Sequence, residues 1–454
     1  MPLLVRKIRT DHLQHGSAMN QSSPFSRRDF VKGSAAASMA ALATFELGHT
    51  AHAAGSDEIK IALVGCGGRG TGAAANALLN KSHSNIRLIA VADAFAEPIE
   101  HALKDLHRQF PDRVDVPAER RFVGLDAYEK AIAAGPDLVL LCTPPGFRPA
   151  HFAAAVKAGK HVFMEKPVAV DAPGYRAVKA ASEQAKAKGL YVAVGHNMRH
   201  DPVRRELVRQ IHDGLIGDLV FTRSYFNTSG IWNRPRTPGM SEMQYQVNNW
   251  YHFVWLSGDH LVEQHVHGID QCNWLARSHP VQATGMGGRA VRAEPGIGEI
   301  FDHHCVQYTY GDGSYSISEC RQQPGCWSNV SNHAHGTKGC VHFDGNIFTV
   351  VLQGAEPKRL KPGAETHQSE WDDLIAAVVA GRPYNEADWG ADSTLTAILG
   401  RMATYSGQLV TWDEAIRSDL TYAPDRLAWD ATPRSKPGAD GIYPCAIPGV
   451  TKAL

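Results

Sequence analysis

The sequence predicts an α/β fold in which a parallel sheet, covered by helices on both faces, is followed by an α+β domain with a large, mostly antiparallel sheet. Three observations predict it. Apolar strands alternate with helical segments over 59–196, a glycine-rich turn follows the first strand, and longer runs of alternating polarity begin at residue 218. Continuous apolar strands are typical of a parallel sheet buried on both faces, whereas alternation is typical of a sheet with one solvated face.

The first region is predicted to alternate strand and helix throughout. Its expected strands lie at 59–64, 86–92, 137–142, 161–164 and 190–195. Its expected helices lie at 70–80, 96–108, 126–133, 149–158 and 173–187. Because ligands of open parallel sheets bind beyond the carboxyl ends of the strands, the turns that follow these strands form the candidate site.

The second region differs in pattern after residue 196. Helices are expected at 202–213, 368–379 and 391–405, and strands at 218–226, 281–289, 304–310, 314–319, 340–344 and 347–352. Residues 228–250 are rich in Trp, Asn, Pro and Met, and an irregular loop of that length is usually functional or a lid. The predicted domains are therefore 54–196, 197–417 and a Pro- and Gly-rich tail, 418–454, that wraps the surface.

Residues 1–53 are predicted to be a targeting segment. Ser26–Lys32 has the sequence SRRDFVK, an alanine-rich stretch follows at 33–45, and Ala51–Ala53 forms an A-x-A cleavage site, a combination typical of a twin-arginine export signal. An unprocessed N-terminal anchor or a disordered basic tail is the alternative. The apolar stretch is shorter than the roughly 20 residues that span a bilayer. We therefore expect a periplasmic or secreted protein, exported by the twin-arginine machinery, with no membrane anchor in its mature form.

The composition argues against several classes of partner. Its 46 Lys and Arg residues balance 46 Asp and Glu residues over 454 positions, so the chain has no electrostatic footprint for nucleic acid. None of its eight cysteines forms a C-x-x-C pair, which argues against a zinc ribbon. No metal site is predicted.

The glycine-rich turn has the pattern G-x-G-x-x-G at Gly65, Gly67 and Gly70, between an apolar strand and a helix. The first glycine permits the tight turn, the second lets the backbone approach a pyrophosphate, and the third lets the helix pack on the strand. Asp93 ends the next strand, at the distance expected for a carboxylate that binds ribose hydroxyls. This carboxylate favours NAD over NADP, because it repels a 2′-phosphate. A purely structural turn is the alternative.

Three further groups of residues could do chemistry. Thr143–Pro144 ends a central strand and should lie over a cofactor, and Lys166 ends the next strand within Glu165–Lys166–Pro167. The segment 258–270 is predicted to open a helix on which Glu263, His267 and Asp270 recur at spacings of four and three, and so share a face. A carboxylate and an imidazole four residues apart can hold a hydroxyl while the imidazole accepts its proton.

With these motifs the sequence resembles the Gfo/Idh/MocA family of glucose–fructose oxidoreductases and inositol dehydrogenases, strongly over 59–200 and fairly to about 345. The matching residues are Gly65–Gly70, Asp93, Thr143–Pro144, Ala158–Val162, Glu165–Lys166–Pro167, Arg199 and 258–270. The resemblance implies a Rossmann domain with a nicotinamide cofactor, and a second domain whose open sheet serves oligomerisation, as a homodimer or homotetramer. It also implies a catalytic Lys, Asp and His, which fall on Lys166, Glu263 and His267. Glu263 departs from the family pattern, which has Asp there.

These arguments define three sets of predicted site residues. The catalytic set is Lys166, Glu263 and His267. The cofactor-binding set is Gly65, Cys66, Gly67, Gly68, Arg69, Gly70, Asp93, Thr143, Pro144, Glu165 and Lys166. The substrate set is Arg199, Trp250, Tyr251, His265 and Asp270.

The predicted function is an NAD-dependent oxidoreductase, with NADP as the alternative cofactor, that acts on a sugar, glycoside or polyol. Periplasmic NAD is scarce, so we expect the cofactor to be tightly bound and recycled in place. An NAD-dependent glycoside hydrolase resembling the α-N-acetylgalactosaminidases, which oxidise C3 transiently, is a second hypothesis. A metal-binding or non-catalytic sugar-binding protein is a third, because His265, His267 and Asp270, with His303 and His304, are ligand-type residues. Against a shared metal, side chains two apart on a helix diverge.

Overall fold

The computed structural model describes residues 58–454 except 82, 84 and 364. The predicted export signal at 1–53 lies outside the described residues. The described residues cluster as one unit. Among the described helices, none is both long and apolar enough to cross a membrane.

The first sheet has six parallel strands in the order β3-β2-β1-β4-β5-β6. Its strands are β1 (Ile59–Val64), β2 (Ile86–Asp93), β3 (Arg121–Val123), β4 (Leu138–Leu141), β5 (His161–Met164) and β6 (Val192–Val194). The connecting helices are α2 (Gly68–Leu78), α3 (Ala96–Gln109), η1 (Ala118–Arg120), α4 (Ala127–Ala133), α5 (Arg148–Lys157), α6 (Ala172–Ala187) and η2 (Asn197–His200). The parallel α/β prediction is confirmed.

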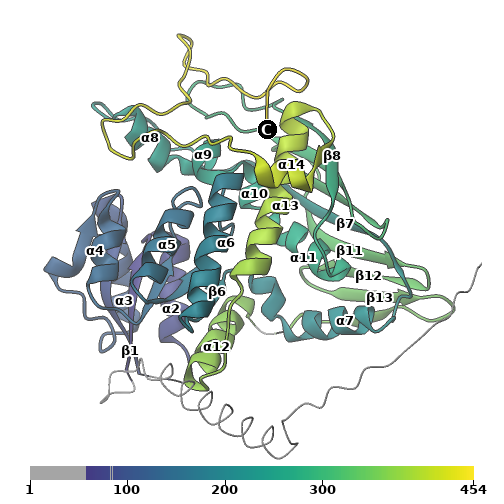
Figure 1. Cartoon of the computed structure of the whole chain (residues 1–454), viewed down its shortest axis with the longest axis horizontal. Coiled ribbons are helices and arrows are strands. Elements are labelled where there is room, and N and C mark those ends of the chain that lie inside the picture. Colours follow the sequence, from purple (N-terminus) through teal and green to yellow (C-terminus); the bar gives the residue numbers. More distant parts are fainter. Residues whose placement is uncertain (1–57, 82, 84, 364) are drawn as a thin grey trace, which may run out of the picture. The chain divides into compact units, whose positions relative to one another are not determined.

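Strand β1 explains why the first sheet has no polar face. Its residues Ile61 and Leu63 belong to one hydrophobic core, while Ala62 and Val64 belong to another on the opposite face. Side chains alternate across a strand, so burial of both sets requires helices on both sides of the sheet. Figure 1 shows this layered arrangement, with α4, α5 and α6 in front of the strands.

The second sheet has nine strands in the order β14-β13-β12-β11-β7-β10-β9-β8-β15. Its strands are β7 (Leu219–Thr228), β8 (Gln282–Gly288), β9 (His303–Thr309), β10 (Tyr315–Gln322), β11 (Asn329–Gly336), β12 (Gly339–Asp344), β13 (Phe348–Leu352), β14 (Lys358–Leu360) and β15 (Val410–Thr411). Only the β7–β10 pair among these is parallel. The mostly antiparallel prediction is confirmed, and β11, β14 and β15 are strands that the sequence pattern did not predict.

The helices of the second region pack partly on the nine-stranded sheet and partly on the first sheet. They are α7 (Pro202–His212), α8 (Glu242–Asn248), η3 (Trp250–His252), α9 (Val254–Ser257), α10 (His260–Glu263), α11 (Val266–Ala276), α12 (Thr366–Val379), α13 (Ala387–Ser406) and α14 (Trp412–Arg417). Helix α13 contacts both α6 of the first region and β8 of the second. It therefore joins the two sheets (Figure 1).

Helix α12 returns to the first sheet although it follows the second in the chain. The indole of Trp371 stacks on the ring of Phe163 in β5, with centroids 4.4 Å apart. Leu374 and Ile375 also belong to the core of the six-stranded sheet. The predicted second domain, 197–417, thus contributes a helix to the first domain's core.

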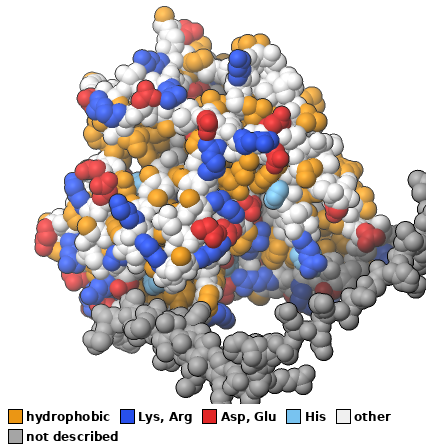
Figure 2. Space-filling view, viewed as in Figure 1, with side chains coloured by type: hydrophobic (Ala, Val, Ile, Leu, Met, Phe, Trp, Pro, Cys, Tyr) orange, Lys and Arg blue, Asp and Glu red, His pale blue; other side chains and the backbone are white. Residues whose placement is uncertain are grey.

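The segment 228–250 and the C-terminal tail lie together. The segment contains helix α8, whose start is fixed by a capping box between Ser241 and Gln244. The tail has no helix or strand over 418–454, and it meets the segment where the Ser241 hydroxyl donates to the Trp429 carbonyl at 2.8 Å. On the face in Figure 2, basic and acidic side chains are interspersed rather than gathered by sign.

Candidate active site

The three glycines of the G-x-G-x-x-G turn have different structural roles. Gly65 has φ +97°, and a Cβ there would lie 2.6 Å from the carbonyl carbon of Cys142. A Cβ on Gly70 would lie 1.9 Å from the carbonyl oxygen of Gly65, so this glycine permits the close contact of α2 with the turn. A Cβ on Gly67 or Gly68 would meet no atom within 4 Å. A ligand can therefore approach the backbone closely at the start of α2, where a helix has unpaired N–H groups, as a pyrophosphate site requires.

A cavity of about 790 Å³ begins at this turn. The predicted cofactor residues that line it are Gly65, Cys66, Gly67, Gly68, Asp93, Thr143 and Pro144. Arg234, Met240 and Trp250 of the second region line it too. Its size is within the range of pockets that bind small molecules and cofactors, and the residues present fit a dinucleotide.

Asp93 is fixed at the cavity wall by backbone donors. Its Oδ2 accepts the N–H of Cys66 at 2.7 Å, and its Oδ1 accepts the N–H of Phe95 at 3.0 Å. Burial raises the pKa of Asp93, whereas these two N–H groups oppose the rise. Each carboxylate oxygen has a second lone pair, so Asp93 can still accept hydrogen bonds from ribose hydroxyls.

Arg69 binds protein carboxylates rather than lining the cavity. Its Nε lies 2.5 Å from Glu165 Oε1, and its Nη2 lies 3.3 Å from Glu370 Oε1. A buried carboxylate needs a counter-charge, and Arg69 supplies it to two. Burial and the neighbouring Glu165 raise the pKa of Glu370 well above its ordinary value. Burial also opposes ionisation of Glu165, but Arg69 and Lys166 hold its pKa below the ordinary value.

Arg148 ties together the turns that follow β4 and β5. It is buried, and its guanidinium donates to the carbonyl oxygens of Thr143 and Pro167. The Thr143 hydroxyl also lies 3.2 Å from His151 Nδ1. The loop carrying Lys166 is therefore fixed relative to the loop at the cavity wall.

Lys166 meets the second region at Glu263. Its Nζ donates to the Glu263 carbonyl at 2.6 Å and lies 3.2 Å from the Glu263 carboxylate. Both side chains are mostly buried, with 13% of each exposed. Two of the three predicted catalytic residues are thus in direct contact, although they are 97 positions apart in the sequence.

The predicted continuous helix over 258–270 is wrong. Helix α10 ends at Glu263 and α11 begins at Val266, with two turn residues between them. The His265 N–H bonds to the His260 carbonyl, five residues back, at 3.1 Å. This wider turn rotates the following residues relative to a regular α-helix. Glu263 and His267 are therefore not held by simple helical spacing.

His267 lies beside His196, which follows β6. Its ring is 5.9 Å from the ring of His196, measured between centroids. Its Nδ1 is buried and has no hydrogen-bond partner among the described residues. Burial lowers the pKa of His267 well below 6.5, and the positive charge of Lys166 lowers it further. The imidazole is consequently neutral near pH 7, which is the form that accepts a proton.

The structure places several predicted substrate residues within the protein's own contacts. Arg199 and Asp270 form a two-pronged ion pair with N–O distances of 2.9 Å, and the Arg199 guanidinium lies 3.9 Å from the Trp389 ring centre. His265 is buried near Phe226, and burial lowers the pKa of His265 to about 3.

The two predicted aromatic contacts differ from each other. Trp250 lines the cavity, whereas Tyr251 is buried. The Tyr251 hydroxyl donates to Gln264 at 3.0 Å and accepts from Gln322 at 2.8 Å. Trp250 is therefore the aromatic residue of this pair that is placed to meet a ligand.

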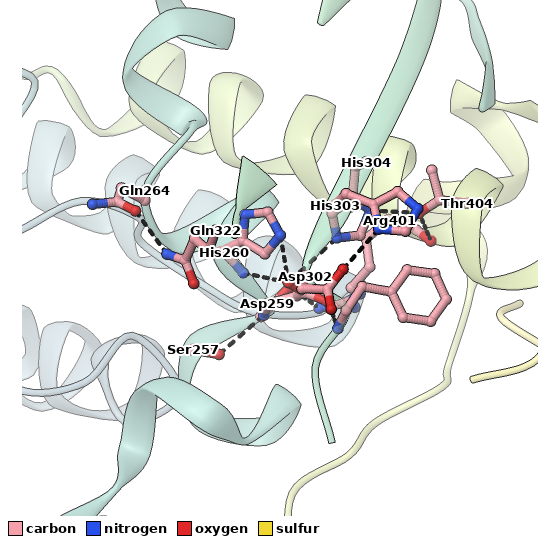
Figure 3. A network of polar contacts seen from close by, with 12 residues as sticks. Ser257, Asp259, His260, Gln264, Asp302, His303, His304, Gln322, Arg401 and Thr404 are labelled. Atoms are coloured by element: carbon pink, nitrogen blue, oxygen red, sulfur yellow. Dashed lines mark hydrogen bonds and ion pairs between the residues drawn. The ribbon is translucent and has the colours of Figure 1, made fainter. Parts of the chain in front are cut away.

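A buried polar network supports α10 from behind (Figure 3). Asp259, at φ +77°, accepts the N–H of Phe301 at 3.0 Å and the hydroxyl of Tyr405 at 2.5 Å. His304 Nε2 lies 3.3 Å from its other oxygen. Burial opposes ionisation of Asp259, but His304 holds its pKa far below the ordinary value. This anchored carboxylate fixes the start of the helix that carries Glu263.

Sequence reasoning missed Arg148, His196 and Asp259. The position of His196 two residues after β6 carries the same signal that identified Lys166, because both follow the carboxyl end of a parallel strand. For Arg148 and Asp259, whose partners are remote in the chain, no local pattern gave a signal.

Comparison with known proteins gives consistent results. A model of an oxidoreductase family with an NAD-binding Rossmann fold matches residues 59–196. Inositol 2-dehydrogenase of Rhizobium meliloti (strain 1021) is 27% identical over 285 residues, which cover 62% of this chain and 74% of that protein. The 2,7-anhydro-N-acetylneuraminate hydratase of Mediterraneibacter gnavus is 25% identical over 208 residues, 46% of this chain and only 51% of that protein.

Two solved structures illustrate the shared fold. The aldose-aldose oxidoreductase of Caulobacter crescentus, complexed with glycerol, superposes with a TM-score of 0.63 at 20% identity, covering 78% of this chain and 99% of that one. A levoglucosan dehydrogenase in complex with NADH and levoglucosan superposes with a TM-score of 0.62 at 18% identity, with the same coverage of both chains.

Proposed function

Because the chain belongs to the Gfo/Idh/MocA oxidoreductases and its first region is an NAD-binding Rossmann domain, we propose that it moves hydride between a hydroxyl-bearing carbon of a sugar, glycoside or polyol and a tightly bound NAD. The observation that carries this proposal is the contact of Lys166 with Glu263, together with a half-buried His267 whose lowered pKa keeps it neutral. Lys166 follows β5 at the carboxyl end of the first sheet, the end at which Gly65, Asp93 and Thr143 line the cofactor cavity.

Each residue has a role that follows from its chemistry. Bound NAD supplies the hydride acceptor. The Lys166 ammonium and the Glu263 carboxylate orient substrate hydroxyls by hydrogen bonding. His267 accepts the hydroxyl proton, and the low dielectric of its site keeps it in the neutral form that this step needs.

Retention of the cofactor is supported by the way the cavity is walled. Arg234, Met240 and Trp250 of the second region line the cavity together with the glycine turn. Trp429 of the tail packs on Phe95, another lining residue, with ring centroids 5.4 Å apart. A dinucleotide held there would contact both regions. Asp93 favours NAD over NADP by its charge.

The same proposal includes location and assembly. The SRRDFVK motif at Ser26–Lys32 supports twin-arginine export to the periplasm, a route that carries folded proteins with their cofactors. The half-exposed face of the nine-stranded sheet, on which Tyr315 and Ile317 lie, supports a homodimer or homotetramer.

A redox-assisted hydrolysis or hydration remains the second candidate, because one relative is named as a hydratase. Such a reaction leaves the cofactor unchanged after each turnover. Oxidation of a sugar, in contrast, leaves the nicotinamide reduced until a second substrate reoxidises it. The nicotinamide absorbance therefore separates the two candidates.

The test starts from the purified mature protein without added cofactor. Denaturation should release about one dinucleotide per chain, identified by mass spectrometry. Sugars, glycosides and polyols are then mixed with the intact protein, and the substrate is the compound that raises the reduced-nicotinamide absorbance. Release of free sugar from nitrophenyl glycosides with no absorbance change would instead establish hydrolysis.

The His267→Ala variant tests the assigned base. Turnover should fall by about 10²–10⁴-fold, the usual contribution of a positioned general base, while dinucleotide content stays unchanged because His267 does not line the cofactor cavity. His107→Ala, on the exposed side of α3, is the matched control and should keep full activity. Near-full activity of His267→Ala with the identified substrate would refute the assignment.

A further inference from the structure

Three histidines lie together on the outer face of the nine-stranded sheet, away from the cofactor cavity. His333 and His335 are on β11, and His342 is on β12, where it pairs directly with His333. Residues two apart on a strand face the same side. All three imidazoles therefore project from one side of the sheet, and each is half-exposed.

Their geometry matches a set of metal ligands. One ligand atom from each ring lies within 4.8 Å of the other two. Zn²⁺ binds imidazole nitrogens at about 2.0–2.1 Å, which places tetrahedral ligands about 3.3 Å apart. Side-chain rotations that close at most about 1.5 Å would complete the set, so the backbone does not have to move.

Neighbouring residues already orient these rings. His335 stacks on Phe221 with ring centroids 4.3 Å apart and planes 6° from parallel. The Ser331 hydroxyl lies 3.0 Å from His333 Nε2, and the Cys340 thiol lies 3.4 Å from His342 Nε2. A surface hollow of about 450 Å³ borders His333 and His342, so an ion and its water ligand have access.

The charges around the cluster favour neutral imidazoles. Burial and the neighbouring His342 lower the pKa of His333 to about 4, Arg223 lowers it further, and Asp344 opposes the shift. Burial likewise lowers the pKa of His335 and of His342.

A second histidine cluster differs because its carboxylate is already bonded to other protein groups. Asp259, His260 and His304 also bring ligand atoms within 4.8 Å. However, all three residues are buried, and the Asp259 carboxylate is already engaged by Phe301, Tyr405 and His304. The outer cluster has no carboxylate or other charged partner bonded to its rings among the described contacts.

We propose that His333, His335 and His342 form a binding site for Zn²⁺, with water as the fourth ligand. Three imidazoles and an open position are a known zinc arrangement. The site lies on the sheet face that also carries Tyr315, because Phe221 pairs with both Tyr315 and His335. It is thus on the face proposed above for oligomerisation, and it does not depend on the hydride-transfer proposal.

The test titrates ZnCl₂ into untagged full-length protein that has been freed of metal with a chelator. Isothermal titration calorimetry should show one Zn²⁺ per chain. His333→Gln and His342→Gln should each weaken binding by at least tenfold, because loss of even a supporting partner of a metal ligand typically costs 10–100-fold in affinity. His107→Gln, on α3 of the first region, should bind as the unmodified chain does.

Two outcomes would overturn the proposal. The unmodified chain could show no Zn²⁺ binding, or the His333→Gln/His335→Gln/His342→Gln variant could retain the original stoichiometry and affinity. Circular dichroism melting establishes that each variant is folded, which is expected because the three side chains are half-exposed. A folded triple variant that no longer binds Zn²⁺, beside a control that does, would establish the site.

Discussion

The cofactor end and the reaction end of the proposed site are built from different groups. At the cofactor end, the glycine turn presents backbone: Gly67 and Gly68 border open space, and Asp93 is held by backbone N–H groups. At the reaction end, the proposed groups are the side chains of Lys166, Glu263 and His267, which come from different elements.

This difference decides how each end is stabilised. The cofactor end depends on one local turn, and its requirement is that no side chain be present. The reaction end depends on a buried network centred on Asp259, which fixes α10 from behind. Substitutions at the two ends should therefore affect different properties of the protein, and three measurements can test this.

The largest expected effect on stability is at Asp259. Replacing it with Ala leaves His304, the Tyr405 hydroxyl and the Phe301 N–H without their partner, and breaking a buried pair in this way typically costs about 3–5 kcal/mol. We expect Asp259→Ala to lower the free energy of unfolding by that amount in a denaturant titration. Turnover should also fall, because the start of α10, the helix that carries Glu263, would no longer be fixed.

Asp105→Ala is the control for this prediction. Asp105 pairs with Arg108 on the surface, where 53% of the Asp105 side chain is exposed, and exposed ion pairs contribute little. Equal denaturation midpoints for Asp259→Ala and Asp105→Ala would show that the network does not support the reaction end.

A matched pair of glycine substitutions tests the cofactor end. In Gly70→Ala the new Cβ would lie 1.9 Å from the Gly65 carbonyl oxygen, so the turn must shift, and overpacking of this kind typically costs about 1–3 kcal/mol. In Gly67→Ala the Cβ meets no protein atom within 4 Å. Gly67→Ala should leave the melting temperature of the cofactor-free protein nearly unchanged, while it reduces the dinucleotide recovered when the purified protein is denatured.

The opposite pattern would contradict the assigned roles of these glycines. If Gly67→Ala melts early and keeps its dinucleotide, the space beside Gly67 is not used by a ligand. The two substitutions are chemically identical, so the difference between them measures position alone.

The same difference between the ends explains what could be predicted from the sequence. The turn from β1 into α2 was predicted in detail because the reasons for its glycines lie within a few residues. The position of Lys166 just after a strand was likewise predicted correctly. The position of Asp93 at the end of β2 was predicted because strands and helices alternate at regular intervals in this region.

Features that depend on remote contacts could not be predicted. Strand β11 was missed because its outward positions hold Ser331, His333 and His335, so it lacks an alternating apolar pattern. The break between α10 and α11 was missed because the sequence 258–270 has ordinary helical spacing. The docking of α12 on the first sheet depends on Trp371 meeting Phe163, more than 200 positions earlier in the chain.

The smallest expected effect is the pH dependence of hydride transfer, which distinguishes a buried base from an exposed one. Burial disfavours the imidazolium form and so lowers the pKa of His267 well below 6.5. A histidine with the ordinary pKa of about 6.5 would be only about one-tenth neutral at pH 5.5, and the rate would fall about tenfold from its value at pH 7.5. With the lowered pKa, the single-turnover rate of nicotinamide reduction should change by less than about twofold over that interval. Circular dichroism at each pH serves as the control for folding. A tenfold loss with a midpoint near 6.5 in a folded protein would mean that His267 is solvated at the moment of reaction, and the reaction end would then resemble the open cofactor end rather than differ from it.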